Sequence, residues 1–237
     1  MKFKIKGNEV VIKKIYPNSS ISKVDGKVLG GKITIYSVIR RFKERRGAKR
    51  PIGDNCPMLY AMKGAEGLTT DADTINKVYE HAQKLIDEYS FEENLPFDVI
   101  ILMPSKHEIG RNLANLLSQK FDIEIIDNFL KKKEPEKLFD EVKKDHSIPQ
   151  DAKQALKAAL RSDSGTFSIK DVAPKHRKYL HIFNGYNLQL PKGTKHVLLV
   201  DDISSSGATF ESAVAVIKQH CKQVETISAF TLFAPLK

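Results

Sequence analysis

The spacing of hydrophobic and polar residues changes near residue 70. Before that point, apolar and polar residues alternate in short segments at 2–7, 9–16 and 31–39, and Gly, Asn and Ser separate these segments. Alternation over a few residues predicts β-strands with one face buried. We therefore expect a small β-rich segment over 1–70, appended as a hood to a larger domain over 71–237.

Beyond residue 70, the apolar positions predict helices that alternate with short strands. Helical spacing of three and four begins after Asp73, which we expect to cap the first long helix. Aliphatic or alternating runs at 98–103, 122–127, 196–202 and 224–233 predict strands. Strands that alternate with helices predict an α/β fold with a doubly wound, mainly parallel sheet, and such sheets bind ligands at the carboxyl ends of their strands.

Composition narrows the class of protein further. The longest aliphatic runs, at 99–103 and 197–200, are far too short to cross a membrane, and the N-terminus lacks the apolar segment of a signal peptide. These features predict a cytoplasmic protein. Cys56 and Cys221 have no second thiol or histidine at ligand spacing, which favours buried free thiols over a disulfide or a zinc site.

The formal net charge of +10 suggests a polyanionic partner. The segment 40–50 holds seven Lys and Arg and a single acid, so it could meet nucleic acid, a phosphorylated substrate or an acidic partner, or simply face solvent. The candidate contacts to nucleic acid are Arg40, Arg41, Arg45 and Arg46. A second charged tract, 131–144, mixes both signs at helical spacing and predicts an exposed helix without an assigned function.

The segment 197–209, VLLVDDISSSGAT, carries the candidate chemistry. A turn of small residues that opens onto a helix exposes backbone amides to an anion such as phosphate. The chain has neither the lysine-bearing loop of nucleoside triphosphatases nor the glycine pattern of dinucleotide-binding folds. Asp201 and Asp202 would repel a phosphate, so we expect them to hold hydroxyls or a hydrated cation instead. A ribose 5-phosphate meets both requirements.

This segment resembles the phosphoribosyl pyrophosphate (PRPP) signature of type I phosphoribosyltransferases, and the order of motifs agrees over roughly 56–234. The resemblance implies that Asp201 and Asp202 hold the ribose hydroxyls and stabilise a positive sugar ring. It implies a 5-phosphate site made of Ser204, Ser205, Ser206, Gly207, Ala208 and Thr209. It also implies that the diphosphate and its Mg²⁺ face Ser105, Lys106, His107 and Arg111, with Lys106 in a catalytic role.

Within that family the chain is most similar to the ComF-like branch. The segments 56–67, CPMLYAMKGAEG, and 110–112, GRN, carry this similarity, although the cysteine-rich zinc ribbon frequent in that branch is missing. Lys63 in the first segment is as readily a surface lysine as a site residue. The polar stretch 161–195 has the composition of a lid over the diphosphate. Its candidate residues are Lys175, His176 and Arg177.

Two hypotheses about function follow. The first is a phosphoribosyltransferase that uses PRPP and Mg²⁺, acts on an unassigned nitrogenous acceptor and releases pyrophosphate, with a homodimer expected only by analogy. The second is a PRPP or nucleotide sensor without activity that binds nucleic acid or a partner through its basic N-terminal segment. An ordinary strand, turn and helix at 197–209 is the structural alternative. A receiver domain is excluded because only 35 residues follow Asp202.

Overall fold

The computed structural model describes residues 1–28, 31–41, 52–91, 97–161, 167, 169, 172–204 and 207–234. Its strands are β1 (Lys2–Lys6), β2 (Glu9–Lys14), β3 (Ser22–Val28), β4 (Gly31–Ile39), β5 (Val99–Leu102), β6 (Glu124–Ile126), β7 (Leu130–Lys132), β8 (Phe183–Gly185), β9 (His196–Ile203) and β10 (Thr226–Phe233). Its helices are α1 (Pro57–Met62), α2 (Ala72–Glu88), α3 (Ile109–Phe121), α4 (Pro135–Lys144), α5 (Gln150–Leu160), α6 (Ala208–His220) and the 3-10 helix η2 (Pro174–Tyr179).

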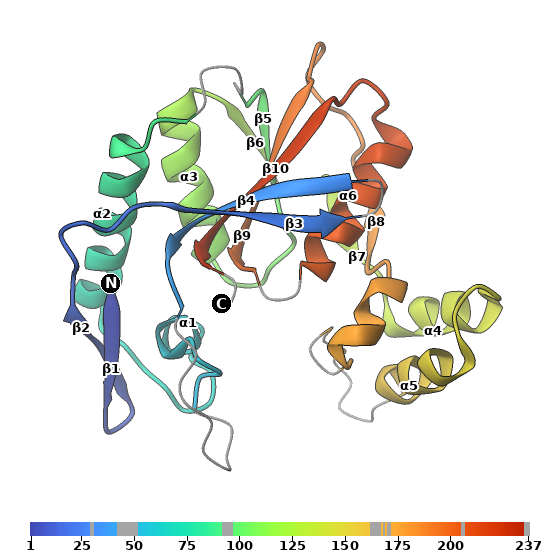
Figure 1. Ribbon diagram of the computed structural model, residues 1–237, viewed down its shortest axis with the longest axis horizontal. Coiled ribbons are helices and arrows are strands. Elements are labelled where there is room, and N and C mark those ends of the chain that lie inside the picture. Colours follow the sequence, from blue (N-terminus) through green and yellow to red (C-terminus); the bar gives the residue numbers. More distant parts are fainter. Residues whose placement is uncertain are drawn as a thin grey trace.

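A mostly parallel sheet of six strands forms the centre of the molecule (Figure 1). Its order is β3-β4-β10-β9-β5-β6, and only the edge strand β3 runs antiparallel to its neighbour. The chain is therefore a mixed α/β protein, as the alternation of strands and helices predicts. The central strands β5 and β9 are aliphatic because side chains on both of their faces are buried.

Helices cover both faces of this sheet. On one face, α1, α2 and α3 pack against Leu198 and Val200 of β9, together with the inward residues of neighbouring strands. On the other face, α6 and the segment that contains α4 and α5 pack against Val197 and Leu199. The period-two alternation of β9 thus fills two separate cores. None of the helices in the described part of the chain is long and apolar enough to cross a membrane.

The N-terminal strands divide between two places. The hairpin β1–β2 stands apart from the central sheet and is tied to the loop before α2, where Val10 N donates to Thr69 O at 2.8 Å and Thr69 N donates to Asn8 O at 2.9 Å. In contrast, β3 and β4 belong to the central sheet itself. The alternating pattern of residues 1–70 predicts one appended segment, yet its second half completes the main sheet.

The start of α2 differs from the expectation by two residues. Asp71, not Asp73, is the N-cap, and its Oδ1 accepts a hydrogen bond from Thr74 N at 2.5 Å. Asp73 lies in the first turn and pairs with Lys77 at 2.5 Å, one helical turn later. Both acids are suited to a helix N-terminus, and spacing alone does not distinguish them.

A helical insert extends from β7 to β8 and includes α4, α5 and η2 (Figure 1, lower right). Leu138 and Val142 of α4 pack with Leu156 of α5 in a core continuous with that of the sheet. The insert begins and ends in the antiparallel pair β7–β8, which holds its two ends side by side. Part of the polar stretch 161–195 is therefore ordered as η2 and β8.

Candidate functional site

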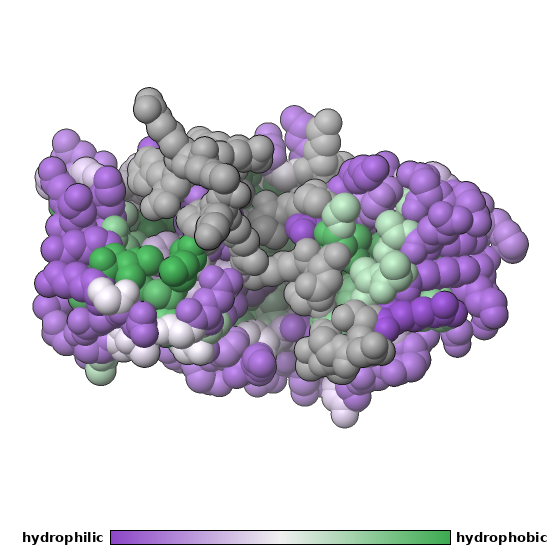
Figure 2. Space-filling view, turned by 90° about the horizontal axis from the view of Figure 1, so that it is seen from below, coloured by the Kyte–Doolittle hydropathy of each residue, from purple (hydrophilic) through white to green (hydrophobic). Residues whose placement is uncertain are grey.

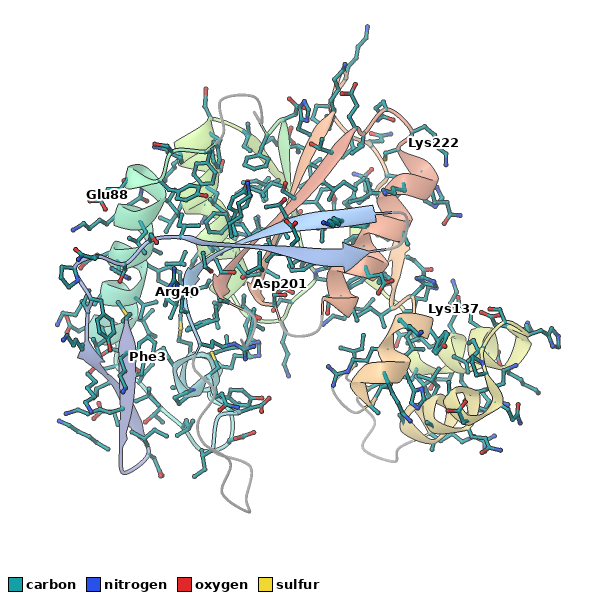
Figure 3. The ribbon with its side chains drawn as sticks, in the orientation of Figure 1. Phe3, Arg40, Glu88, Lys137, Asp201 and Lys222 are labelled. Carbon is teal, nitrogen blue, oxygen red and sulfur yellow. The ribbon has the colours of Figure 1, made fainter. Side chains whose placement is uncertain are left out.

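The carboxyl ends of the parallel strands meet at one edge of the sheet, between α1 and the helical insert (Figure 1). Here β9 ends in Asp201, Asp202 and Ile203, and Figure 3 labels Asp201 at this edge. The adjacent strand β5 continues past Met103, whose N donates to Val200 O at 2.9 Å, into the loop 104–108. The sequence-predicted acids and diphosphate loop therefore follow neighbouring strands.

Figure 2 views the molecule from the side of this edge. Hydrophilic residues cover most of the surface, and apolar residues gather in two places, over the N-terminal elements on the left and over the helical insert on the right. The candidate site is formed by described side chains around β9, β5 and α1.

Asp202 is the buried member of the acidic pair. Its side chain is 6% exposed and forms an ion pair with Lys63 Nζ, itself on a side chain 20% exposed. Lys63 caps the C-terminus of α1, a helix that starts at Pro57 because proline suits the first helical position. A residue from the N-terminal segment thus neutralises an acid at the end of β9. Lys63 is therefore not a free surface lysine, because it contacts one of the two candidate acids.

Asp201 keeps part of its side chain on the surface and accepts a hydrogen bond from Asp202 N at 2.8 Å. Burial, followed by repulsion from Asp202, raises the pKa of Asp201 to about 7, although Lys63 and Lys132 oppose the increase. Two adjacent acids at the end of one strand are therefore not both fully ionised near neutral pH. A carboxyl group in this state can either accept or donate a hydrogen bond to a sugar hydroxyl.

The loop after β5 approaches the acids closely. Gly110, in the first turn of α3, lies beside the backbone of the acids, and a Cβ there would be in ordinary van der Waals contact with Asp201 C and Asp202 N, both at 3.7 Å. Ser105 and Lys106 are exposed, and Ser105 Oγ accepts from His107 N at 3.1 Å. Burial and then the positive charges of Lys63 and Lys106 lower the pKa of His107. Near neutral pH, this side of the site combines a neutral imidazole with two lysines.

Arg111, the fourth predicted diphosphate contact, forms an ion pair with an acid that follows the neighbouring strand β6. Its Nη2 pairs with Asp127 Oδ2 at 2.5 Å, beyond the end of β6. This pair is partly exposed, with side-chain exposures of 30% and 55%. The structure therefore groups Ser105, Lys106 and His107 and sets Arg111 at the neighbouring strand end.

The predicted phosphate cradle lies between β9 and α6. Ser204 is buried, and its Oγ has no hydrogen-bond partner in the described structure. Ser205 and Ser206 lie outside the described residues. Gly207 is the N-cap of α6 in the left-handed region with φ 79°, and among the described residues no side chain caps the first turn of this helix. The helix terminus consequently presents backbone donors at the same edge as the acids.

Arg41 has an interior position behind this cradle. Its Nε donates to Ala234 O at 2.5 Å and its Nη2 donates to Ser204 O at 3.2 Å, so the guanidinium joins the ends of β4, β9 and β10. Burial lowers the pKa of Arg41 and raises the pKa of the neighbouring Cys56 thiol to about 12. Both cysteines are free and buried, as predicted. Arg40 is exposed, and Arg45 and Arg46 lie outside the described residues.

The lid candidates lie in η2, on the helical insert. Lys175 is exposed, whereas His176 is buried at 7% exposure. Arg177 Nε donates to Val172 O at 2.8 Å. Of these three side chains, Lys175 is the one whose placement suits contact with an external anion.

Two further residues belong to this neighbourhood although no motif indicated them. The positive charge of Lys132, on β7, lowers the pKa of both Asp201 and His107. In the sequence Lys132 belongs to the mixed-charge tract 131–144, which predicted only an exposed helix. Tyr79 on α2 donates its hydroxyl to Ile109 O at 3.3 Å, and burial raises its pKa to about 12. A tyrosine beside the apolar face of a helix has no spacing that would distinguish it from a core residue.

Clusters of metal-ligating side chains were sought in the described ranges. The described ranges contain no group of three or more His, Cys, Asp and Glu residues placed to share an ion. A magnesium ion would fit here with phosphates and water as most of its ligands. Asp201 would be the nearby acid, because it has no lysine partner in the described part of the chain.

Comparison with known proteins adds no family, because no protein-family model matches the chain and no curated protein matches it.

Proposed function

We propose that this protein binds PRPP with Mg²⁺ and transfers its phosphoribosyl group to a nitrogenous acceptor, releasing pyrophosphate. The observation that carries the proposal is the adjacent pair Asp201 and Asp202 at the carboxyl end of β9, between the uncapped terminus of α6 and the loop after β5. The mostly parallel sheet with helices on both faces is compatible with a type I phosphoribosyltransferase fold, which forms part of the same proposal.

The acids are suited to the ribose ring. A partly protonated Asp201 and the Lys63-neutralised Asp202 carry less combined charge than two free carboxylates, so they oppose the phosphates of the substrate less strongly. They still place negative charge beside the ring. When the bond from C1 to the diphosphate oxygen breaks, that charge stabilises the positive ring that develops.

The two helix termini supply sites for the phosphate groups. Amides of Ala208 and Thr209 and the unpartnered Ser204 Oγ would hold the 5-phosphate. Ser105 and Lys106 would hold the diphosphate, and the charge of Lys132 lies in the same neighbourhood. Bound magnesium would supply positive charge to the departing diphosphate. The leaving diphosphate takes the electron pair of the C1–O bond, the acceptor nitrogen forms the C1–N bond, and the nitrogen then loses its proton.

The second hypothesis is a sensor that binds PRPP or a nucleotide without transfer. Of its candidate nucleic-acid contacts, Arg41 is engaged with the backbone carbonyls of Ala234 and Ser204. We favour the enzyme because the acids and the phosphate donors lie at the same end of β9. Calorimetric binding of PRPP without pyrophosphate release across a broad panel of bases and amines would instead select the sensor.

The test combines turnover with binding. With PRPP, Mg²⁺ and a panel of nitrogenous acceptors, we expect pyrophosphate release, and calorimetry should detect PRPP binding that the double variant Asp201→Asn/Asp202→Asn loses by at least about tenfold. The matched control is Asp98→Asn, at the amino edge of the same sheet, which should leave PRPP affinity unchanged. Equal PRPP affinity of the wild type and the double variant would refute the assignment of the site.

A further inference from the structure

An exposed surface lies on the antiparallel pair β7–β8, where the helical insert joins the rest of the chain. Lys131 pairs with Asn184 across the two strands, so their side chains lie on the same face. The next residue, Lys132, projects to the opposite face, in keeping with its effect on Asp201 and His107. The outer face of this ribbon, defined by Lys131, Asn184, Tyr186 and the nearby Lys137, is called the β7–β8 platform below.

Tyr186 is the most exposed large hydrophobic residue in the described ranges, at 68%. An exposed aromatic ring is common in loops whose backbone has no hydrogen bonds to the rest of the chain. The backbone at Tyr186 does have such bonds. Tyr186 N donates to Phe129 O at 2.9 Å, and Asn187 N donates to Asn128 O at 3.1 Å. A Cβ on Gly185 would lie 2.3 Å from Leu188 Cδ2, so glycine permits the close turn that follows β8. The ring is thus held outward by a rigid turn.

One lysine lies over this ring, and a second lysine contacts the amide of Asn184 on the same ribbon. Lys131 Nζ lies 5.8 Å from the ring centroid, and Lys137 Nζ lies 3.4 Å from Asn184 Oδ1. Figure 3 labels Lys137 where the helical insert meets the rest of the molecule. Within the described part of the chain, neither Lys131 nor Lys137 forms an ion pair with a carboxylate, whereas the adjacent Lys133 pairs with Glu141 at 2.7 Å. Lys131, over the ring, and Lys137, beside Asn184, therefore remain available for an external anion.

The charge of the surrounding segment has the same sign. Residues 130–187 contain thirteen Lys and Arg and eight Asp and Glu, a net excess of five positive charges within a total of +10 for the chain. An acidic peptide would satisfy the lysines but would leave the ring exposed. A nucleobase can stack on the ring while its own phosphates contact the lysines, and an aromatic ring among cations is the common arrangement for single strands.

We propose that the β7–β8 platform binds single-stranded nucleic acid, with one base stacked on Tyr186 and neighbouring phosphates on Lys131 and Lys137. Asn184 lies where its amide can meet the edge of the stacked base. The platform is a different surface from the proposed PRPP site, so this binding needs neither PRPP nor transfer activity.

The experiment measures fluorescence anisotropy of a labelled oligothymidylate of about twelve nucleotides with the full chain, across a salt series. The wild type should bind, and Tyr186→Ala should weaken binding by roughly 5- to 100-fold with little change in the salt dependence. Lys131→Gln and Lys137→Gln should each reduce the slope of log affinity against log salt by about 0.7. The matched control is Tyr16→Ala, which removes another exposed tyrosine with a lysine over its ring, at 5.1 Å, and should bind as the wild type does.

Three further probes separate the alternatives. An abasic strand of the same length should bind the wild type and Tyr186→Ala equally, because it offers phosphates without bases to stack. Polyglutamate should not compete at equal charge concentration, and thymidine monophosphate should bind far more weakly than the strand. Undetectable strand binding, equal strand affinity of wild type and Tyr186→Ala, effective competition by polyglutamate, or a monophosphate as tight as the strand would each overturn the proposal. Because these side chains are exposed, unchanged melting temperatures should show that the variants fold.

Discussion

The polar groups at the two ends of β9 differ in how fully they are hydrogen-bonded. At the amino end, Asp98 accepts from the amides of Lys195 and His196, both at 2.7 Å, and His196 Nδ1 lies 2.8 Å from Thr226 Oγ1. At the carboxyl end, two acids are adjacent, one of them with a pKa raised to about 7. Near them lies a buried serine hydroxyl without a partner in the described structure.

This difference shows where the fold keeps polar groups incompletely satisfied. Buried hydroxyls normally have hydrogen-bond partners, and adjacent like charges in a folded chain are unfavourable. Natural sequences retain such local conflicts mainly at functional sites. We therefore expect the polar groups at the amino end of β9 to be structural, and we expect a ligand to complete those at its carboxyl end.

Loss of a lysine should lower the free energy of unfolding far more at the carboxyl end of β9, where Lys63 lies, than at its amino end. In Lys63→Met, Asp202 would remain buried beside Asp201 without its partner, and we expect a loss of about 3–5 kcal/mol in the free energy of unfolding at pH 8. Lys195→Met removes the exposed pair with Glu225, at 2.7 Å, near the other end and should cost at most about 1 kcal/mol. Urea denaturation of both variants measures the difference.

The second acid provides the control for this prediction. Asp202→Asn in the Lys63→Met background should recover much of the lost stability, because it removes the buried charge that the lysine had neutralised. Equal losses in Lys63→Met and Lys195→Met would contradict a special electrostatic state at the carboxyl end of β9.

Much of the fold was predictable from local pattern. The alternation of strands and helices beyond residue 70 predicted the mixed α/β class, and the strands at 98–103, 122–127, 196–202 and 224–233 overlap β5, β6, β9 and β10. The place of β3 and β4 was not predictable. Alternation predicts a strand, whereas the sheet that a strand joins depends on long-range pairing, here of β4 with β10.

The site was predictable only where residues are contiguous. The segment 197–209 and the loop after β5 carry their own local patterns. Lys63 and Lys132 reach the acids through tertiary packing, from α1 and from the strand that opens the helical insert. The partner of Arg111 was not predictable either, because its place in the motif gives no information about Asp127. Its contact with the diphosphate stays a prediction.

Asparagine substitutions at the two ends should change stability in opposite directions. The pKa of Asp201 in the folded state lies above its ordinary value of 3.8. Between roughly pH 4 and 7, the folded state therefore keeps the Asp201 proton that the unfolded state has lost. Above pH 7 the folded state must ionise Asp201 too, and the full free-energy cost of that ionisation is subtracted from stability. Asp201→Asn should therefore stabilise the fold by roughly 1–3 kcal/mol at pH 8, and the gain should fade towards pH 4. Asp98→Asn weakens two charge-assisted hydrogen bonds and should cost about 1 kcal/mol.

Thermal unfolding at pH 8 and pH 5 tests both substitutions. The same substitutions can be followed by calorimetry with PRPP. The PRPP affinity of the wild type should fall as the pH rises through about 7, because ionised Asp201 opposes the phosphates more strongly, and Asp201→Asn should show only the pH dependence that comes from the ligand itself. If both Asp201→Asn and Asp98→Asn destabilised the fold at pH 8, the predicted electrostatic difference between the two ends of β9 would be wrong.

The smallest expected effects concern the two hydroxyls. Ser204→Ala removes a buried Oγ without a partner in the described structure, so stability should change by less than about 1 kcal/mol, while PRPP affinity should fall because the 5-phosphate loses a donor. Thr226→Val removes the hydrogen bond to His196 and should cost about 1 kcal/mol without altering PRPP affinity. Urea denaturation and calorimetry together distinguish the two. A Ser204→Ala variant that loses stability yet binds PRPP normally would mean that its hydroxyl supports the fold, and that the carboxyl end of β9 is satisfied without a ligand.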